Sequence, residues 1–447
     1  MAEADTLELK TYTGNSSSLY KAPEVSLCAV RSADSCYWGV LSAPMKMEQK
    51  VTTSGGKCQV DYLVDKRFDH LMTSYMTIEV PKIKVREEYS GQVRVAWCHN
   101  LPHNVTKDGT FIWNNSPCMK WDTVSLDQDL QVFKKKTPQS WEYLEKWRSG
   151  QSAMPLSVAH PWFYSTMTER GWPITGESYH RYNLRLKIKD LLRIQVKNAQ
   201  GAWTPYTDGF ISKYLELSDD ATLDIPELWG RYSLRGPEER EWAKQCASSS
   251  SPEEPLVITQ WFHTIIAADS DPGQYGQKLT VKLSQPNARV SSIMFSAENM
   301  EATRENNRSN YTTSIDSVHT GWNPISHVSL SYESSSGFVP KFEHLPALHF
   351  TGERLEDQFP GEAREAGHYA FSHAWDPDFY DADWTQQYNK LKPELSVWLA
   401  DGSPDAEEMK EDEITGPKFK LRCRMRVVRE WKIKYTKTGI EMEFGSC

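Results

Sequence analysis

The sequence predicts an all-β protein made of two β-sandwiches. Short runs in which apolar and polar residues alternate recur along the chain, whereas sustained helical periodicity is scarce. An alternation of period two sets apolar side chains on one face of a strand and polar ones on the other. At 447 residues the chain exceeds what one hydrophobic core usually supports, so two domains are expected. Many short strands separated by Pro-rich loops are typical of sandwiches.

The alternating runs are clearest at four places. Three of them are Val93–Trp97, Leu184–Ile188 and Leu279–Leu283. In the fourth, KFKLRCRMRV at 418–427, five apolar residues share one face and basic residues fill the other. This pattern predicts a strand whose apolar face meets a core and whose basic face meets solvent.

One change in composition divides the chain. Helix-forming residues at 140–148 and 237–246 predict two short helices, the second with Pro237 at a plausible first position. The tract ASSSSPEEP at 247–255 follows and has linker character. We therefore expect an N-terminal domain over residues 1–250 and a C-terminal domain over 251–447. A second polar tract, 401–413, is expected to be an exposed loop between two strands.

Composition favours a folded protein with large interfaces. Hydrophobic residues make up 39% and charged residues 25% of the chain, as in globular proteins and unlike disordered ones. Seventeen Trp and 20 Tyr are a heavy aromatic content, which suits strands and protein–protein contacts.

The charge argues against a broad nucleic-acid-binding surface. The net charge is −9, and a basic run such as Lys134–Lys136 is more typical of a solvated surface than of a phosphate site. No apolar stretch approaches the roughly 20 residues that span a bilayer, and the acidic N-terminus lacks the apolar core of a signal peptide.

The eight cysteines and the glycosylation sequons carry little functional information. The cysteines lie far apart without a CxxC pair, which favours mostly reduced thiols over a zinc site or a disulfide framework. The sequons begin at Asn104 and Asn310, and without a signal peptide they have little weight.

Two groups of residues could bind metal. His99 and His103 have the spacing that places two zinc ligands on one helix face, but Pro102 lies between them in a strand-like context, so buried or loop histidines are the better interpretation. Four acids, Asp376, Asp378, Asp381 and Asp383, could bind calcium. The EF-hand glycine and terminal glutamate are missing, which favours a solvated turn with backbone-capping aspartates.

No catalytic constellation is visible. An acidic, Trp-rich sandwich is compatible with a carbohydrate-binding module or a glycoside hydrolase, but nothing fixes a pair of carboxylates. GxSxG, Walker A, GxGxxG and HExxH motifs are absent from the sequence. We therefore predict no catalytic, cofactor-binding or metal-binding residue, no cofactor, and a protein that is not an enzyme.

The segment His368–Leu399 is the most informative part of the sequence. Two apolar runs, 369–375 and 395–399, flank an acidic, Pro-containing stretch, which predicts two antiparallel strands joined by a structured surface loop. The order of residue types resembles the late strands of the double jelly-roll major capsid proteins of nucleocytoplasmic large DNA viruses, in particular the iridovirus-like ones.

The resemblance extends in the same order over most of the chain. Tracts 59–83, 154–186, 228–245, 283–295 and 427–439 are similar to successive strands of those proteins. Their Arg-x-x-x-x-Asn-Leu-x-His-Asn tract is matched by Arg94, Asn100, Leu101, His103 and Asn104, and the end of their first domain by Tyr232, Glu239 and Arg240. The chain departs from the family at Arg181, Asn287 and Thr438-Gly439, which marks it as a divergent member.

The resemblance implies two eight-stranded jelly rolls packed side by side and a homotrimeric, pseudo-hexagonal capsomer. Such capsomers form the virion capsid shell over an internal membrane, beside neighbouring capsomers, minor capsid proteins and a penton protein, after assembly in the host cytoplasm. Direct nucleic-acid binding is not expected. The stretches 297–320 and 334–367, which are long and polar, are expected to form the exterior loops.

Three alternatives remain open. A double jelly-roll scaffold, as poxviruses use on immature particles, or a minor capsid protein would share the fold. A lectin or carbohydrate-active enzyme would belong to a different class.

Limited proteolysis tests the expected domain junction. We expect early cleavage within 247–255, because an exposed polar linker is a preferred protease site. Cleavage that spares this tract and falls inside a sandwich strand would contradict the division.

Overall fold

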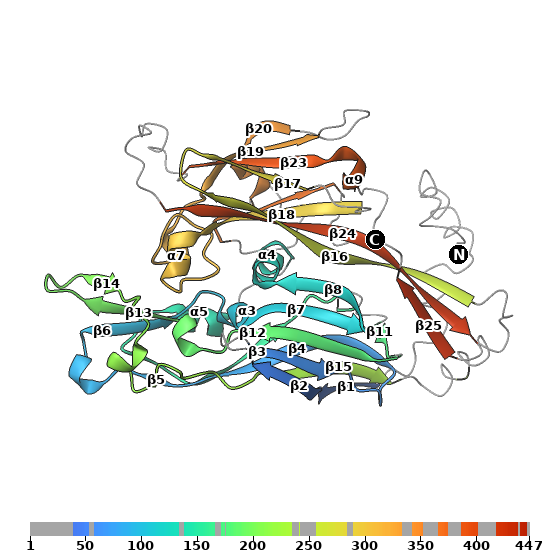
Figure 1. The fold of residues 1–447 in the computed structure, drawn as a ribbon, viewed down its shortest axis with the longest axis horizontal. Helices are drawn as coiled ribbons and strands as arrows, with labels where there is room; N and C mark the ends of the chain where they lie inside the picture. The colour runs from blue at the N-terminus through green and yellow to red at the C-terminus, as the bar shows by residue number, and fades with distance from the viewer. Residues whose placement is uncertain are drawn as a thin grey trace, which may run out of the picture.

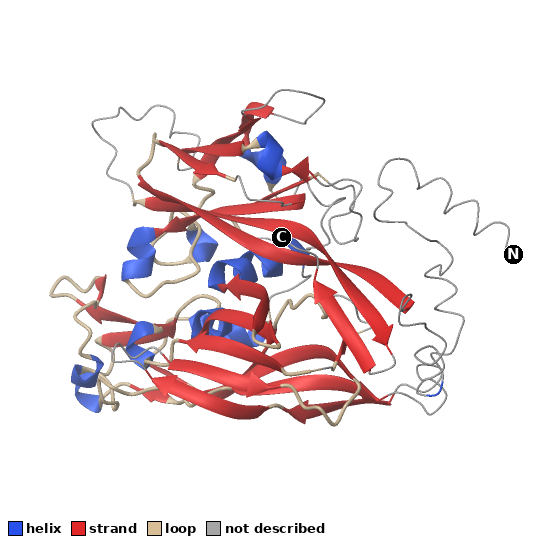
Figure 2. Ribbon diagram, turned by 45° about the vertical axis from the view of Figure 1, so that its right-hand side comes forward, coloured by secondary structure: helices blue, strands red, loops and turns tan. Residues whose placement is uncertain are grey.

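The computed structural model consists of two β-sandwiches stacked on one another (Figure 1, Figure 2). It describes residues 39–52, 58–133, 138–165, 171–174, 176–234, 241, 256–283, 289–332, 342–351, 365–373, 386–400, 417–436 and 439–444.

The first sandwich is a jelly roll. One sheet has the order β1 (Gly39–Pro44), β15 (Glu227–Leu234), β4 (His70–Val80), β10 (Met154–Ala159), with β11 (Trp172–Pro173) also paired to β4. The other has the order β2 (Lys46–Thr52), β3 (Cys58–Leu63), β12 (Ser178–Leu184), β7 (Thr106–Trp113), β8 (Ser116–Asp122). When the eight main strands are counted along the chain, without β2 and β11, the two sheets read 1-8-3-6 and 2-7-4-5, the jelly-roll order. Every pairing is antiparallel.

The second sandwich repeats this order. One sheet contains β16 (Leu256–Gly273), β24 (Phe419–Thr436), β18 (Arg289–Asn299) and β21 (His368–Ser372), with β22 (Gln386–Gln387) paired to β18 and β25 (Gly439–Phe444) paired to β24. The other contains β17 (Lys278–Lys282), β23 (Pro393–Leu399), β19 (Ile325–Tyr332) and β20 (Phe342–Pro346). The prediction of two antiparallel eight-stranded jelly rolls is thus confirmed.

Long connections gather at one end of each sandwich, because the loops that follow strands 3, 5 and 7 of a jelly roll all lie at the same end. In the first sandwich they carry a small sheet of β14 (Trp203–Pro205), β13 (Leu192–Lys197) and β6 (Val93–Trp97), and the pair β5 (Ile83–Lys84) and β9 (Gly150–Gln151). They also carry α3 (Leu101–Val105), α4 (Thr123–Phe133), α5 (Gln139–Glu145), η1 (Glu87–Tyr89), η2 (Ile188–Asp190) and η3 (Ile211–Lys213). In the second sandwich they carry α7 (Met300–Arg304), η4 (Val318–Thr320) and η5 (Ala347–Phe350), while α9 (Tyr388–Leu391) lies at the opposite end.

Each sandwich has its own hydrophobic core. The first is rich in fully buried aromatic rings, among them Trp97, Phe111, Trp121, Trp162 and Trp172. Gly109 of β7 is required there, because a Cβ at this position would lie 2.5 Å from the Trp121 ring. The second core is mainly aliphatic and includes Ile293, Phe295, Val397, Leu421 and Met425. Apolar burial on this scale is the main driving force for folding each sandwich.

Several local predictions are confirmed and others are wrong. Strands β6 and β17 and helix α5 lie where the sequence predicts them. The strand predicted through Leu184–Ile188 ends at Leu184, and Ile188 begins the 3-10 helix η2 instead. The predicted helix at 237–246, the junction at 247–255 and the loop at 401–413 lie outside the described residues, except for Glu241.

The segment His368–Leu399 does not form a strand pair. β21 belongs to one sheet of the second jelly roll and β23 to the other, so the two strands are not hydrogen-bonded neighbours. The prediction was wrong because strands 6 and 7 of a jelly roll cross between sheets, which local alternation does not reveal.

The basic face of 418–427 is solvated only at its start, where Lys418 is exposed and Lys420 and Arg422 are half-buried. Arg424 is 1% exposed and Arg426 is 6% exposed, although the apolar residues of β24 face the second core as predicted. The reason is that this sheet is covered on both faces, by its own core and by the first sandwich.

The two stretches expected as exterior loops also need correction. In 297–320, β18 continues to Asn299, and the loop from α7 onward packs against the first sandwich. The stretch 334–367 contains β20 and η5 and is therefore not one loop.

Candidate functional site at the seam between the jelly rolls

The seam is the set of contacts between the two sandwiches, and α4 is its central element. Figure 1 shows α4 between β8 of the first sandwich and β18 of the second. Val132 of α4 packs with Met294 and Ala370, which lie on the face of the β18–β21 ladder opposite the second core. Phe262 of β16 contacts Phe163 of the first core, with ring centroids 4.8 Å apart. The apolar part of the seam is therefore small, and most of it is polar.

Arginines of β24 form the largest ionic group in the seam. Arg424 binds Asp122 at the end of β8 through two nitrogens, at 3.1 and 2.5 Å, and Asp269 of β16 at 2.7 Å. Arg422 pairs with Asp269 at 2.5 Å and with Glu298 at 2.6 Å. The guanidinium of Arg426 lies 3.9 Å from the centre of the Phe133 ring. Burial by itself would raise the pKa of Asp122, but the positive charge of Arg424 has the larger effect and the pKa is lowered. The buried guanidinium of Arg424 therefore faces an ionised carboxylate at Asp122.

Asp127 of α4 is a buried hydrogen-bond acceptor shared by both sandwiches. Its Oδ1 accepts from Asn100 Nδ2 at 3.0 Å and from His103 Nδ1 at 2.8 Å, and its Oδ2 accepts from the Tyr311 hydroxyl at 2.8 Å. Tyr311 belongs to the loop after α7, so the contact crosses the seam. Burial raises the pKa of Tyr311 well above its usual value, and the neighbouring Asp127 carboxylate raises it further. The hydroxyl therefore remains a donor.

His99 joins the two sandwiches as a cation. Its Nδ1 lies 2.8 Å from Glu145 of α5 and its Nε2 lies 2.7 Å from Glu365 of the second sandwich. Carboxylates only accept, so both ring nitrogens must carry protons. Burial lowers the pKa of His99, but the two carboxylates outweigh it and hold the pKa well above 6.5. Burial likewise raises the pKa of Glu365, and His99 overcomes it to bring the value to about 2.

The loops of the two sandwiches also meet directly. Asn306 donates to the carbonyl of Lys189 at 2.7 Å, and Arg308 donates to that of Asp190 at 3.1 Å. Asn104 donates to Ser309 Oγ at 2.8 Å. These hydrogen bonds join side chains of one sandwich to carbonyls and hydroxyls of the other, and they restrict the relative orientation of the sandwiches.

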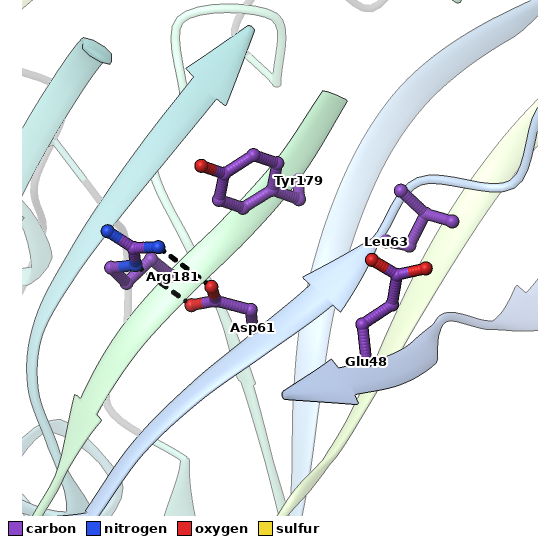
Figure 3. Close-up of a pocket in the computed structure, with 5 residues that line it drawn as sticks. All are labelled: Glu48, Asp61, Leu63, Tyr179 and Arg181. Atoms are coloured by element: carbon purple, nitrogen blue, oxygen red, sulfur yellow. Dashed lines mark hydrogen bonds and ion pairs between the residues drawn. The ribbon is translucent and has the colours of Figure 1, made fainter. Parts of the chain in front are cut away.

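A shallow hollow on the face of strands β2, β3 and β12 that points away from the first core offers no catalytic arrangement. It is lined by Glu48, Asp61, Leu63, Tyr179 and Arg181 from β2, β3 and β12 (Figure 3). Arg181 and Asp61 are register partners and form a two-point ion pair at 2.9 and 2.8 Å. The pair gives the basic residue at position 181 a structural role, because it neutralises Asp61 on the neighbouring strand.

The two predicted metal candidates have different outcomes. His99 and His103 face separate carboxylates, and the strand-like context expected around Pro102 is in fact the short helix α3. No group of three or more His, Cys, Asp or Glu side chains in the described part of the chain is placed to hold a metal ion. The four aspartates of 376–383 lie outside the described residues.

Both sequons and the four cysteines among the described residues lie in the interior. Asn104 is 2% exposed and Asn310 is fully buried, and each side-chain amide donates a hydrogen bond inside the protein. Cys98, Cys118 and Cys423 are buried thiols, and burial raises the pKa of each to about 12. These positions are inaccessible to modification in the folded chain.

Sequence reasoning missed the main components of the seam. Helix α4 was not predicted, because Ser125, Asp127, Gln128 and Gln131 are as buried as its apolar residues and no amphipathic pattern remains. The family tract did contain a signal, since Asn100, His103 and Asn104 all lie in the seam.

The fold and the seam define a double jelly-roll protein, and comparison with known proteins identifies its relatives. No family model matches the chain. Over 383 residues it is 19% identical to the major capsid protein of Wiseana iridescent virus, covering 76% of this chain and 75% of that protein. It is 20% identical to that of Invertebrate iridescent virus 6, covering 78% and 76%. A shorter match, 26% identity over 133 residues, links it to the major capsid protein of lymphocystis disease virus 1 and covers 28% and 26%.

Solved structures show the same architecture. The PBCV-1 virus capsid matches with a TM-score of 0.64 at 11% identity, over 92% of this chain and 97% of that one. The Faustovirus major capsid protein matches with a TM-score of 0.61 at 7% identity, over 95% and 96%. The chain is a divergent homologue of iridovirus major capsid proteins, with the double jelly-roll fold of large DNA virus capsid proteins.

Substitution of Arg424 tests the ionic part of the seam. Arg424→Ala removes the cation that Asp122 binds and one of the two that Asp269 binds. We expect it to lower the free energy of unfolding by about 3–5 kcal/mol in chemical denaturation. Arg304→Ala is the matched control, because Arg304 forms an ion pair with Glu301 but its side chain is 70% exposed. The control should cost less than about 1 kcal/mol. Equal effects of the two substitutions would contradict this role for the seam.

Substitution of His99 tests the histidine contact through its pH dependence. The pKa of His99 is higher in the folded chain than its value of 6.5 in the unfolded chain. Its contacts therefore contribute their full stabilisation below pH 6.5, and this stabilisation is lost as the pH rises through the folded-state pKa. The pKa of Glu365 is lowered from 4.5 to about 2 in the folded chain. Its contribution to stability is therefore present above pH 4.5 and is lost as the pH falls towards about 2. The difference in unfolding free energy between the wild type and His99→Gln should therefore be largest between pH 4.5 and 6.5 and shrink at alkaline pH.

The exposed His349 offers a control for this measurement. His349→Gln should change stability little at any pH, because the side chain lies in solvent. A His99→Gln effect that stays constant up to strongly alkaline pH would show that His99 is not a cation in the folded protein.

Proposed function

We propose that this protein is the major capsid protein of a large icosahedral double-stranded DNA virus and that it assembles into trimeric, pseudo-hexagonal capsomers. The observation that carries the proposal is a pair of complete jelly rolls in one chain, similar to the PBCV-1 capsid over 92% of its length. Three such chains would present six similar sandwiches around one axis, which suits a hexagonal lattice.

The seam supports this role. A capsomer needs a fixed angle between its two sandwiches, because each sandwich occupies one place in the pseudo-hexagon. Buried ion pairs and hydrogen bonds have narrow geometric requirements, so the Arg424, Asp127 and His99 contacts favour one orientation over others. We propose residues 1–250 and 251–447 as the two sandwich units, joined rigidly by these contacts.

The surface provides candidate contacts for a trimer. A closed three-fold ring uses two different surfaces of each copy, one facing each neighbour. Exposed apolar side chains occur on both sandwiches: Val40, Leu41 and Met47 on the first, which are 37–47% exposed, and Trp322, Leu345 and Leu348 on the second, which are 36–61% exposed. We propose that these two groups meet between neighbouring copies.

The remaining features fit a structural role. We propose contacts with neighbouring capsomers, minor capsid proteins and a penton protein, localisation in the virion shell after assembly in the host cytoplasm, and no catalytic activity. No helix in the described residues is long and apolar enough to cross a membrane. An assembly scaffold with the same fold would be absent from mature particles, so mass spectrometry of purified virions separates the two functions.

Light scattering tests the trimer. The purified chain should have the mass of three copies at micromolar concentration, and a monomer alone would contradict the proposal. Leu41→Glu and Leu348→Glu should each dissociate the trimer, because each places a charge in an apolar contact. Phe210→Glu is the control, since Phe210 is 64% exposed but belongs to neither group. A trimer that survives both Leu41→Glu and Leu348→Glu would place the contacts elsewhere.

A further inference from the structure

A row of alternating cationic and aromatic side chains lies on the outer face of the small sheet β14–β13–β6. Its members, in spatial order, are Lys197, Trp203, Arg94, Trp147 and Arg193. We call this set the cation–aromatic row. The sheet is built from the long connections of the first sandwich and lies at the end that also carries α7 (Figure 1).

Strand alternation places the row. Val93 and Val95 of β6 point into the first core, so Arg94 between them lies on the other face. On β13, Leu192 and Ile194 are core residues, and Arg193 and Lys197 share the opposite face. Trp203 of β14 pairs with Lys197 in the ladder. Three neighbouring strands therefore present their polar faces side by side.

The contacts are close to cation–π geometry throughout. Arg94 lies 4.5 Å from the Trp203 ring centre and 5.1 Å from that of Trp147, so it is held between two indoles. Arg193 lies 4.6 Å from Trp147, and Lys197 lies 5.1 Å from Trp203. Stacking of this kind holds the guanidinium plane in place and leaves its edge for hydrogen bonding.

One end of the row is closed and the other is open. Arg193 is 5% exposed and donates to Asp316 of the second sandwich. Arg94 is half-buried, and its one hydrogen bond among the described residues runs from Nε to Gln195 at 2.7 Å. Its two terminal nitrogens thus make no hydrogen bond to another described residue. Lys197 is exposed. The free donors of the row therefore lie at the Arg94–Lys197 end.

We propose that the cation–aromatic row binds an acidic glycan, with Arg94 and Lys197 holding a carboxylate or sulfate group and the edge of Trp203 contacting the sugar ring. Guanidinium edges match carboxylates and sulfates in two-point hydrogen bonds, and the electropositive edge of an indole ring can contact the hydroxyl oxygens of a sugar. If the chain has the proposed capsid function, with these loops outward, the ligand would be a glycan of the host cell surface.

The size of the row favours a glycan over nucleic acid. Strands in a sheet are about 4.8 Å apart, so three of them span roughly 10 Å, enough for one or two sugar units. A nucleic-acid strand needs a longer basic track to gain affinity from several phosphates. The net charge of −9 provides no such track over the molecule as a whole.

Isothermal titration calorimetry tests the proposal by measuring how the full-length protein binds a sulfated or carboxylated oligosaccharide. Arg94→Gln combined with Lys197→Gln should weaken binding about tenfold or more, since each removes a charge-assisted hydrogen bond. Lys197→Gln alone should weaken it in the same direction and, because Lys197 is exposed, without affecting folding. Arg304→Gln, which removes one exposed charge elsewhere, should have no effect. The neutral form of the same oligosaccharide should bind much more weakly.

Five results would contradict the glycan proposal or the capsomer proposal, and each can be told from the others. Failure of the wild type to bind any acidic oligosaccharide, or equal binding by Arg94→Gln/Lys197→Gln, would overturn the proposal. Tighter binding of single-stranded DNA of matched charge would assign the row to nucleic acid instead. Loss of the trimer in the double variant would assign it to a contact between copies. A wild type that is monomeric yet binds the glycan would leave this inference standing and remove the proposed capsomer function.

Discussion

The architecture depends on a sheet that is buried on both faces. The apolar side chains of β24 fill the second core, and Arg424 and Arg426 on its other face are buried against the first sandwich. Buried charges are tolerated only with ionised partners at short distance, and Asp122, Asp269 and Glu298 supply them. Because those acids come from different strands, the arginines constrain the positions of β8, β16 and β18 together.

Helix α4 extends this constraint to the loops. It lies between the sandwiches and presents Asp127 to donors from both, while Gln128 donates to Ser296 and Gln131 accepts from the backbone of Glu365. A hydrophobic seam of the same size would allow the sandwiches to slide, since apolar contacts are non-directional. A seam of directed polar contacts favours one orientation, which is what a capsomer subunit with two fixed places in a lattice requires.

The sequence was sufficient for the fold and insufficient for the seam. Alternation at β6, β17 and β24, together with the order of family-like tracts, predicted two jelly rolls, because period-two burial is local information. Which sheet a strand joins is not local, so β21 and β23 were mistaken for a pair. Likewise, the basic residues of β24 predict a solvated face, because the sequence does not show that the first sandwich covers them. His99 binds Glu145 and Glu365, which lie 46 and 266 residues away from it along the chain. No rule of sequence spacing connects residues so far apart.

The contacts of the seam should make the two jelly rolls one cooperative unit. Differential scanning calorimetry of the wild-type chain tests it most directly, because units coupled by several kcal/mol unfold together. We expect a single transition whose calorimetric enthalpy equals its van't Hoff enthalpy. Two separate transitions, one for each sandwich, would contradict it.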